Sequence, residues 1–317
     1  MFNPLTATLI AEIVAEGLLS PDPTIVDLGN QTYGVDLGTL ERIIGALEKV
    51  PAPARGKIDF PALRSLAEIR EKDSQTPRVE QFYRALGFSR YDAIDINSKY
   101  QSLVMDLNRD LDTSYGFRNA YDLVVNTGTS EHVFNQAAFL RNAHNLARPG
   151  GLMAHVVPFT GYINHGFYNY QPNLFYDLAS ANGYSVVRFQ MADRDEVLVD
   201  LGKPSDQAAY FLPYLGLATR NPKNNTFLVV LLRKSSDDDL VYPCQGKYLS
   251  TLEGASLTSY YSGQGPAGAG SRTMFRPESP AGRRARAGRV KIKLKRWLLR
   301  SLRSASRVVL LRLWPRI

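Results

Sequence analysis

Short apolar runs alternate with helical stretches as far as residue 232, and this alternation limits the possible folds more than any other feature of the chain. The expected strands are 24–28, 91–96, 103–107, 121–126, 152–157, 184–191 and 227–232. The expected helices are 1–20, 40–50, 61–73, 79–86, 133–147 and 173–181. Because parallel strands need crossover connections, this order predicts an α/β fold with a doubly wound, mostly parallel sheet covered by helices on both faces.

Basic residues are concentrated at one end of the chain. Of its 38 Lys and Arg residues, thirteen lie in 283–317, a stretch without Asp or Glu. The rest of the chain has 25 basic residues against 30 acidic ones, so the net charge of +8 combines a mildly acidic body with a strongly basic tail. This asymmetry indicates a partner for the tail and not a nucleic-acid-binding fold.

Composition divides the chain into four parts. Residues 1–20 carry only acidic charges and are expected to form an amphipathic helix, not a signal peptide. Residues 21–235 form the α/β domain, with a helical insertion at about 38–88. Ser, Gly, Pro and Asp are frequent in 236–282, which predicts irregular structure and a linker. The basic amphipathic tail occupies 283–317.

The single cysteine, Cys244, cannot form a disulfide within the chain, and a reducing compartment such as the cytoplasm is expected. No apolar run approaches the roughly 20 residues that a membrane-spanning helix needs. Hydrophobic residues make up 44% of the chain, which is enough for a large core. We therefore expect a cytoplasmic protein whose tail can associate with the inner face of the membrane.

The expected membrane contact depends on the pattern of residues 289–313. On a helix of 100° per residue, their basic side chains fall on one stripe and their apolar side chains on the opposite one, while Trp297 and Trp314 suit the headgroup boundary. This pattern is typical of a helix that lies on an anionic membrane surface. A helix docking on a partner protein is the alternative, and the ordered apolar stripe disfavours a nucleic-acid arm.

Polar and small residues follow the carboxyl ends of four expected strands. In an open parallel sheet, ligands bind beyond these ends, where the strand order reverses. A glycine there lets the backbone turn sharply, and a carboxylate suits the hydroxyls of a ribose. The candidate cofactor-binding residues are Asp27, Gly29, Gln31, Asp95, Asp106, Leu107, Asn126 and Thr127.

In this order, the segments DLGNQTYG, AIDI, MDLN, DLVVNTGTSEHV and RPGGLMAHVVP resemble the class I S-adenosylmethionine-dependent methyltransferases. The resemblance covers Thr24 to Leu232 and is to the branch whose fourth strand ends in an EHV-like turn. It implies a seven-stranded sheet whose last strand is antiparallel. It also implies that S-adenosyl-L-methionine lies across the strand ends.

The resemblance also implies roles for individual residues. Asp27 and Gly29 would line the methionine portion of the cofactor, and Asp95 would hold the ribose hydroxyls. Asp106 and Leu107 would flank the adenine. Asn126 and Thr127 would lie beside the sulfonium.

Two features depart from the family pattern. Gln31 and Tyr33 stand where the first loop of the family usually has further glycines, and Gln31 is a candidate cofactor contact itself. The distance in sequence from Asp27 to Asp95 requires an insertion in the first crossover, or a lid. A nicotinamide-dependent oxidoreductase is a competing interpretation, but its G-x-G-x-x-G loop is missing. A degenerate methyltransferase fold acting as a membrane-tethered binding protein is another.

All four histidines lie between positions 132 and 165. His132, in the turn after the fourth strand, and His165, after the fifth, are candidate catalytic bases, and Glu131, next to His132, is a third candidate catalytic residue. A cap for a helix beginning at Val133 is the alternative for His132. His144 is interpreted as a packing or surface residue and His155 as a core residue. The spacing fits no tight metal motif and no cysteines accompany it, so no metal is expected.

The methyl acceptor is suggested by the loop that follows the fifth strand. Seven aromatic residues lie between Phe159 and Tyr176, with Asn164, Asn169 and Gln171 among them. Flat rings and amides suit a saccharide, although a cap packed on the sheet is an equal alternative. The sequence thus predicts a methyltransferase that acts on an oxygen of a small or saccharide acceptor at the membrane surface.

Overall fold

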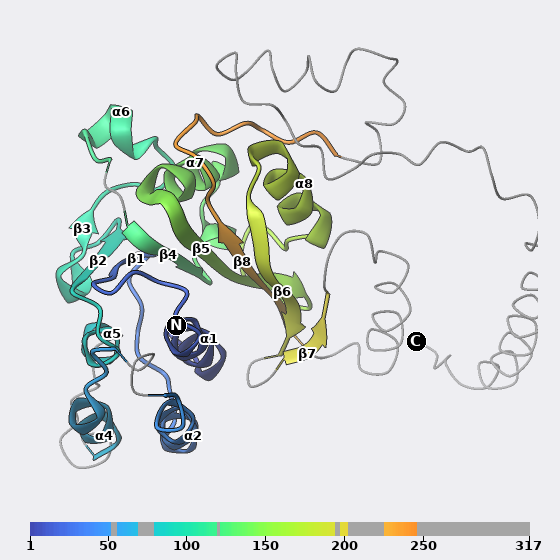
Figure 1. Cartoon of the computed structure of the whole chain (residues 1–317). Coiled ribbons are helices and arrows are strands. Elements are labelled where there is room, and N and C mark those ends of the chain that lie inside the picture. Colours follow the sequence, from blue (N-terminus) through green and yellow to red (C-terminus); the bar gives the residue numbers. More distant parts are fainter. Residues whose placement is uncertain (52–55, 69–78, 119–120, 194–196, 202–224, 246–317) are drawn as a thin grey trace, which may run out of the picture. The chain divides into compact units, whose positions relative to one another are not determined.

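An eight-stranded mixed sheet forms the centre of the computed structural model (Figure 1). The structure describes residues 1–51, 56–68, 79–118, 121–193, 197–201 and 225–245. All of these belong to one compact unit, Met1–Met274, while a second unit, Phe275–Ile317, lies outside the described residues. The predicted linker beyond residue 245 and the predicted tail helix at 289–313 also lie outside them.

The strands stand in the order β3-β2-β1-β4-β5-β8-β6-β7. Their bounds are Thr24–Leu28 (β1), Arg90–Asp95 (β2), Leu103–Val104 (β3), Tyr121–Thr127 (β4), Ala147–Thr160 (β5), Ser185–Ala192 (β6), Val197–Asp200 (β7) and Thr226–Arg233 (β8). Strand β8 runs antiparallel to both β5 and β6, and the pairs on the other side of the sheet are parallel. The predicted seven-stranded sheet with an antiparallel last strand is confirmed, and β7 adds an edge strand.

The strand order places a switch point between β1 and β4. From β1 the chain moves outward to β2 and β3, and it then returns to β4 on the other side of β1. Connections on the two sides of this point lead in opposite directions, which leaves a crevice at the carboxyl ends of β1 and β4. The sequence motifs after these two strands therefore lie where an open α/β sheet binds its ligands.

Helices cover both faces of the sheet (Figure 1). Their bounds are Pro4–Ala15 (α1), Leu37–Leu47 (α2), Phe60–Glu68 (α4), Val79–Ala85 (α5), Leu111–Tyr115 (α6), Gln136–Leu146 (α7) and Pro172–Asn182 (α8). Two short 3-10 helices, Lys99–Gln101 (η1) and Ser130–His132 (η2), lie after β2 and β4. The layers are α1, α2, α4 and α5 on one side and α6, α7 and α8 on the other.

Alternation along the buried strands divides the core into two clusters. In β4, Leu123 and Val125 pack toward α1, α2, α4 and α5, whereas Val124 packs toward α7 and α8. Successive side chains of a strand point to opposite faces, so a strand covered on both sides is apolar throughout. All seven residues of β4 are buried for this reason.

The predicted insertion in the first crossover is present as α2, α4 and α5. Ile43, Leu63 and Phe82, one from each helix, belong to the same buried cluster as Ile25 of β1. In the described residues, these helices form a cover for one face of the sheet, together with α1. The crossover is long because it supplies most of one helical layer.

Side chains at the helix ends explain where the predicted boundaries were displaced. Helix α2 begins three residues earlier than predicted because the Asp36 side chain accepts a hydrogen bond from the Thr39 amide at 2.9 Å. The prediction that a helix begins at Val133 is wrong. Asn135 caps α7, and the residues before it form η2. The prediction that Pro149-Gly150-Gly151 closes this helix is also wrong, because β5 already begins at Ala147.

Three elements differ from the prediction in their length or in their presence. Strand β3 has two residues, and helix α6 and strand β7 were not predicted. In the described part of the chain, every helix is too short or too polar to cross a bilayer.

Candidate active site

The acidic residues of the first three strands are gathered at one edge of the sheet. In the parallel pairing, Asp27 of β1 lies opposite Ala93 of β2, and Asp95 lies opposite Val104 of β3. Asp106 follows two residues after Val104. The register thus places these three residues near the carboxyl ends of neighbouring strands, at the edge that continues to the switch point beside β4.

Gly29 holds the loop after β1 against the loop after β4. Its φ is +91°, and a Cβ atom added to it would lie 2.3 Å from Oγ1 of Thr129. A side chain at this position is therefore excluded by the protein itself, before any ligand is considered. Gln31 joins the same two loops, because its Nε2 donates to the carbonyl oxygen of Thr127 at 3.0 Å.

Asp27 is enclosed by protein. Only 1% of its surface is exposed, and its carboxylate accepts hydrogen bonds from the Tyr83 hydroxyl at 3.1 Å and the Tyr91 hydroxyl at 3.2 Å. Burial raises the pKa of this carboxyl to about 7, although the two tyrosine hydrogen bonds oppose the shift. A contact between the Asp27 carboxylate and the methionine portion of a cofactor stays a prediction.

Asp95 is half-buried at the end of β2 and organises the loops around it. Its carboxylate accepts hydrogen bonds from the backbone amide of Asn30 at 2.9 Å and from the Asn97 side chain at 2.6 Å. The Asn30 side chain in turn donates to Asn97 at 2.8 Å. Asp95 thus connects the loops after β1 and β2 and presents its carboxylate at their junction.

Asp106 and Leu107 occupy the next turn of the rim. The Asp106 carboxylate accepts from both the backbone and the side-chain nitrogen of Asn108, each at 2.9 Å, and these bonds lower its pKa. Leu107 is 4% exposed and belongs to the core on the α7 side. The aspartate fixes the turn, and the leucine anchors it.

The two residues at the end of β4 point to opposite faces. Asn126 is buried, and its side chain bonds Ser130 and contacts Nδ1 of His155 at 3.2 Å, which shapes the turn toward η2. Thr127 faces the loop after β1. In the described residues, neither Oγ1 of Thr127 nor Oε1 of Gln31 has a hydrogen-bond partner, although both atoms are buried.

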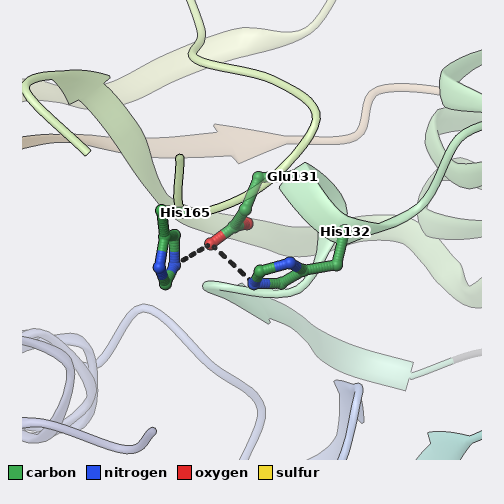
Figure 2. Close-up of side chains that lie close together, drawn as sticks. All are labelled: Glu131, His132 and His165. Carbon is green, nitrogen blue, oxygen red and sulfur yellow. Dashed lines mark ion pairs between the residues drawn. The ribbon is translucent and has the colours of Figure 1, made fainter. Parts of the chain in front are cut away.

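Glu131, His132 and His165 converge beyond the ends of β4 and β5 (Figure 2). Nε2 of His165 lies 3.6 Å from Oε1 of Glu131, and Nε2 of His132 lies 3.9 Å from the same oxygen. The two imidazole rings meet edge to face with their centroids 4.9 Å apart. Glu131 is 1% exposed, whereas about half of each imidazole side chain faces solvent.

Backbone contacts bring the two segments of this cluster together. The amide of Phe167 donates to the Glu131 carbonyl oxygen at 2.7 Å, and a Cβ atom on Gly166 would lie only 2.9 Å from that oxygen. Tyr162 and Asn164 have positive φ values of 50° and 60° in the same loop. Such conformations cost energy for residues other than glycine, so packing must hold this loop in place.

Burial controls the protonation of the cluster. It raises the pKa of the Glu131 carboxyl to about 7. Burial also lowers the pKa of His132, and the neighbouring His165 adds to this effect. His132 is therefore a neutral imidazole near neutral pH and is able to accept a proton.

The other two histidines are structural. His155 is 2% exposed and packs at a tilt against Phe175 with ring centroids 5.2 Å apart, as expected for a core residue. His144 is also buried, and its ring bonds the Tyr184 hydroxyl and, at 2.7 Å, the carbonyl oxygen of Asp238. Burial lowers the pKa of both to about 4.

The aromatic residues after β5 have two different roles. Phe159, Tyr170, Phe175 and Tyr176 are buried in the core, which supports the cap interpretation for them. Phe167 is 66% exposed, meets Phe134 edge to face, and follows the histidine loop. Tyr162 lies against His165 with ring centroids 5.3 Å apart.

Sequence reasoning missed three residues that shape the rim. Asn30 and Asn97 hold Asp95, and Tyr83 holds Asp27. A signal for the two asparagines was present, because each lies one or two residues after a strand-end residue already singled out. No sequence signal marked Tyr83, which lies in the crossover helix α5.

Comparisons with known proteins gave distant structural similarities only. No family model and no curated protein matches the chain. It is similar to the 1,6-didemethyltoxoflavin-N1-methyltransferase of Burkholderia thailandensis (11% identity, TM-score 0.39, covering 73% of this chain and 79% of that chain). It is also similar to a methyltransferase of Geobacter sulfurreducens solved with S-adenosylhomocysteine (16% identity, TM-score 0.32, covering 74% of this chain and 93% of that chain). The cyclase SpnF is a third similar structure (12% identity, TM-score 0.37, covering 73% of this chain and 82% of that chain).

The order and direction of the chain's own strands define its fold. Strands β3-β2-β1-β4-β5-β8-β6 include the antiparallel last strand that the sequence resemblance implied, and this strand lies between β5 and β6. The chain has a Rossmann-like α/β fold, with the sheet that its resemblance to the class I methyltransferases implied.

Proposed function

We propose that this chain is an S-adenosyl-L-methionine-dependent methyltransferase that transfers the methyl group to an oxygen. The observation that carries the proposal is a set of buried polar atoms at the switch point. Gln31 Oε1, Thr127 Oγ1 and the Glu131 carboxylate have no hydrogen-bond partner among the described residues. Because buried polar groups are normally hydrogen-bonded, such a concentration at a ligand-binding edge indicates partners that a bound molecule would supply.

The residues of the rim fit the parts of this cofactor. Asp95, held by Asn30 and Asn97, would accept hydrogen bonds from the ribose hydroxyls. Asp106 and Leu107 would flank the adenine. Gln31 and Thr127 would bind the amino-acid portion through their unpartnered oxygens. The Asp27 carboxylate already accepts hydrogen bonds from two tyrosines. Asp27 would therefore contribute to the cofactor site through its backbone position in β1.

The cofactor, when bound, would supply an electrophilic methyl group. The chain would have to align an acceptor hydroxyl and accept its proton. His132 and His165 lie at solvent-accessible positions beyond β4, and the buried Glu131 stabilises positive charge on either ring. We assign the proton-accepting role to this histidine pair and the orienting role to Glu131.

The acceptor is proposed to be a small molecule or a saccharide. The half-buried Tyr162 beside His165 and the exposed Phe167 offer aromatic faces next to the histidines. Asn164 lies between them in the chain and adds an exposed amide. We further propose that the basic tail holds the protein on the inner face of the membrane, where such acceptors would be attached to lipid.

Calorimetric titration of the full chain with S-adenosylhomocysteine tests the cofactor assignment. We expect binding, and we expect Asp95→Asn to weaken it by about tenfold or more, because a charge-assisted hydrogen bond contributes about 1.5–3 kcal/mol. Asp22→Asn is the matched control. Asp22 forms a surface ion pair with Lys57 that is 65% exposed on both sides, so this change should leave binding intact.

The same titration distinguishes the alternatives. Binding of NAD in place of S-adenosylhomocysteine would replace the proposal with an oxidoreductase. Binding of S-adenosylhomocysteine without methyl transfer to any offered saccharide would favour the membrane-tethered binding protein. An Asp95→Asn chain that binds as tightly as the unaltered one would remove the rim assignment.

A further inference from the structure

We propose that Glu131, His132 and His165 bind a divalent transition-metal ion. One donor atom from each residue lies within 4.8 Å of the other two, and this is the one such group of three His, Cys, Asp or Glu residues in the described part of the chain. Figure 2 shows both imidazoles turned toward the same carboxylate oxygen. Two histidines and one carboxylate form a common ligand set for catalytic metal ions.

The distances are close to those of an occupied site. Ligand atoms about 2.0–2.2 Å from one ion, at tetrahedral angles, lie about 3.4 Å apart. Nε2 of His165 and Nε2 of His132 lie 3.6 Å and 3.9 Å from Oε1 of Glu131. Both imidazoles are about half exposed, so the remaining difference would be closed by rotation of these two rings.

The buried carboxylate provides a second and independent observation. Glu131 is 1% exposed, and neither of its oxygens has a hydrogen-bond partner among the described residues. Burying a carboxylate without a partner is costly, because the group loses its hydration and gains nothing in return. A cation between Glu131 and the imidazoles would supply the missing interaction.

The site is preorganised by the backbone. Glu131 and His132 lie in η2, and His165 lies in the loop after β5. The hydrogen bond from the Phe167 amide to the Glu131 carbonyl oxygen joins these segments, and Gly166 permits their close approach. The three ligands are therefore positioned by the fold before any ion arrives.

The ligand types select the class of ion. Mg²⁺ and Ca²⁺ prefer oxygen ligands, whereas imidazole suits Zn²⁺ and its first-row neighbours. About half of each imidazole side chain is exposed, which leaves open coordination positions on the solvent side. If the proposed methyltransferase function holds, the ion would take over the role assigned to the histidine pair, because an acceptor hydroxyl bound there would have a lowered pKa and would lose its proton to solvent.

Calorimetric titration of the full chain, without a histidine tag and after chelator treatment, tests the site with Zn²⁺ and with Mg²⁺. We expect one Zn²⁺ per chain and much weaker binding of Mg²⁺. Glu131→Gln and His165→Gln should each weaken Zn²⁺ binding by at least about tenfold. Zn²⁺ should also raise the melting temperature of the unaltered chain more than that of either variant.

Two control variants exclude the other places where Zn²⁺ could bind. Cys244→Ser removes the only thiol, and Asp239→Asn alters an open cavity of about 500 Å³ lined by Asp110, Asp112 and Asp239, among others. Both should bind Zn²⁺ like the unaltered chain. His165→Gln changes an exposed loop residue, so it remains informative even if Glu131→Gln fails to fold.

The proposal is overturned if His165→Gln binds Zn²⁺ as tightly as the unaltered chain, or if only the two controls weaken binding. Titration of the same samples with S-adenosylhomocysteine separates this result from the proposed function. Zn²⁺ binding without S-adenosylhomocysteine binding would retain the metal site and remove the methyltransferase assignment. The reverse result would retain the methyltransferase assignment alone.

Discussion

At the scale of single residues, Asp27 carries the clearest consequence for stability. Its carboxyl is buried between Tyr83 and Tyr91, and its pKa rises from 3.8 to about 7. A folded-state pKa above the unfolded value means that burial favours the protonated form. The contribution to stability is therefore complete below about pH 4 and is lost as the pH rises through 7.

Asp27→Asn should remove this pH dependence. We compare the free energy of unfolding of the variant with that of the unaltered chain at each pH. This difference should favour the variant by about 2–4 kcal/mol more at pH 8 than at pH 5, because its amide carries no buried charge at either pH. Urea unfolding at the two pH values, without ligand, measures the difference. Asp22→Asn, at an exposed position, should not change the pH dependence. Parallel stability curves for Asp27→Asn and the unaltered chain would contradict the prediction.

Single residues also mark the limit of sequence reasoning. Asp95 could be singled out because its position at a strand end places it on a ligand-binding edge whatever surrounds it. The enclosure of Asp27 could not be predicted, because Tyr83, which contacts its carboxylate, lies in a helix 56 positions further along the chain. The direct contact between Glu131 and His165 could not be predicted for the same reason, although both were candidate catalytic residues. Sequence spacing excludes a local metal motif but does not reveal ligands that the fold brings together.

At the scale of elements, the loops after β1 and β4 depend on each other through Gly29. Gly29→Ala should destabilise the chain by about 1–3 kcal/mol, because the new Cβ meets Thr129 and the backbone keeps its positive φ. Thr129→Ala in the same chain should recover part of the loss, since it removes Oγ1 and Cγ2 but leaves the backbone strain. Chemical denaturation of the single and double variants measures this coupling.

Gly45→Ala is the matched control for this change. Gly45 lies inside α2, and a Cβ atom there meets nothing within 4 Å. We expect a gain of about 0.5–1 kcal/mol, as for other glycines replaced by alanine within helices. A neutral Gly29→Ala variant would show that the two loops can separate freely.

The elements themselves were largely predictable, and the errors have physical causes. Buried parallel strands such as β4 have a continuous apolar run in their middle, here Leu123 to Val125, which makes them conspicuous in sequence. Strand β7 is only four residues long and pairs at the edge of the sheet, so it lacks this signal. Pro149 and the two glycines after it resemble a helix end, but they form the irregular start of β5, where the register to β4 shifts.

At the scale of the whole molecule, the proposed membrane contact can be tested by removing the tail. A chain ending at Ala281 should lose most of its sedimentation with anionic vesicles, because each basic residue near such a surface contributes about 1 kcal/mol. Neutral vesicles should retain little of either chain. Replacing Leu298 and Leu302 with Ser keeps the charge and should reduce binding only in part. Equal sedimentation of the truncated and full chains would contradict the prediction.

The position of β8 has a consequence for how the protein is made. This strand is last along the described sheet in sequence but lies in its interior, between β5 and β6. A ribosome delivers β6 and β7 earlier, before the strand that joins them to β5 has been made. Strands β6 and β7 must therefore wait, and β5 keeps an unpaired edge, until residue 233 has emerged from the exit tunnel. A nascent chain stalled before that residue is the form most exposed to chaperones and to aggregation.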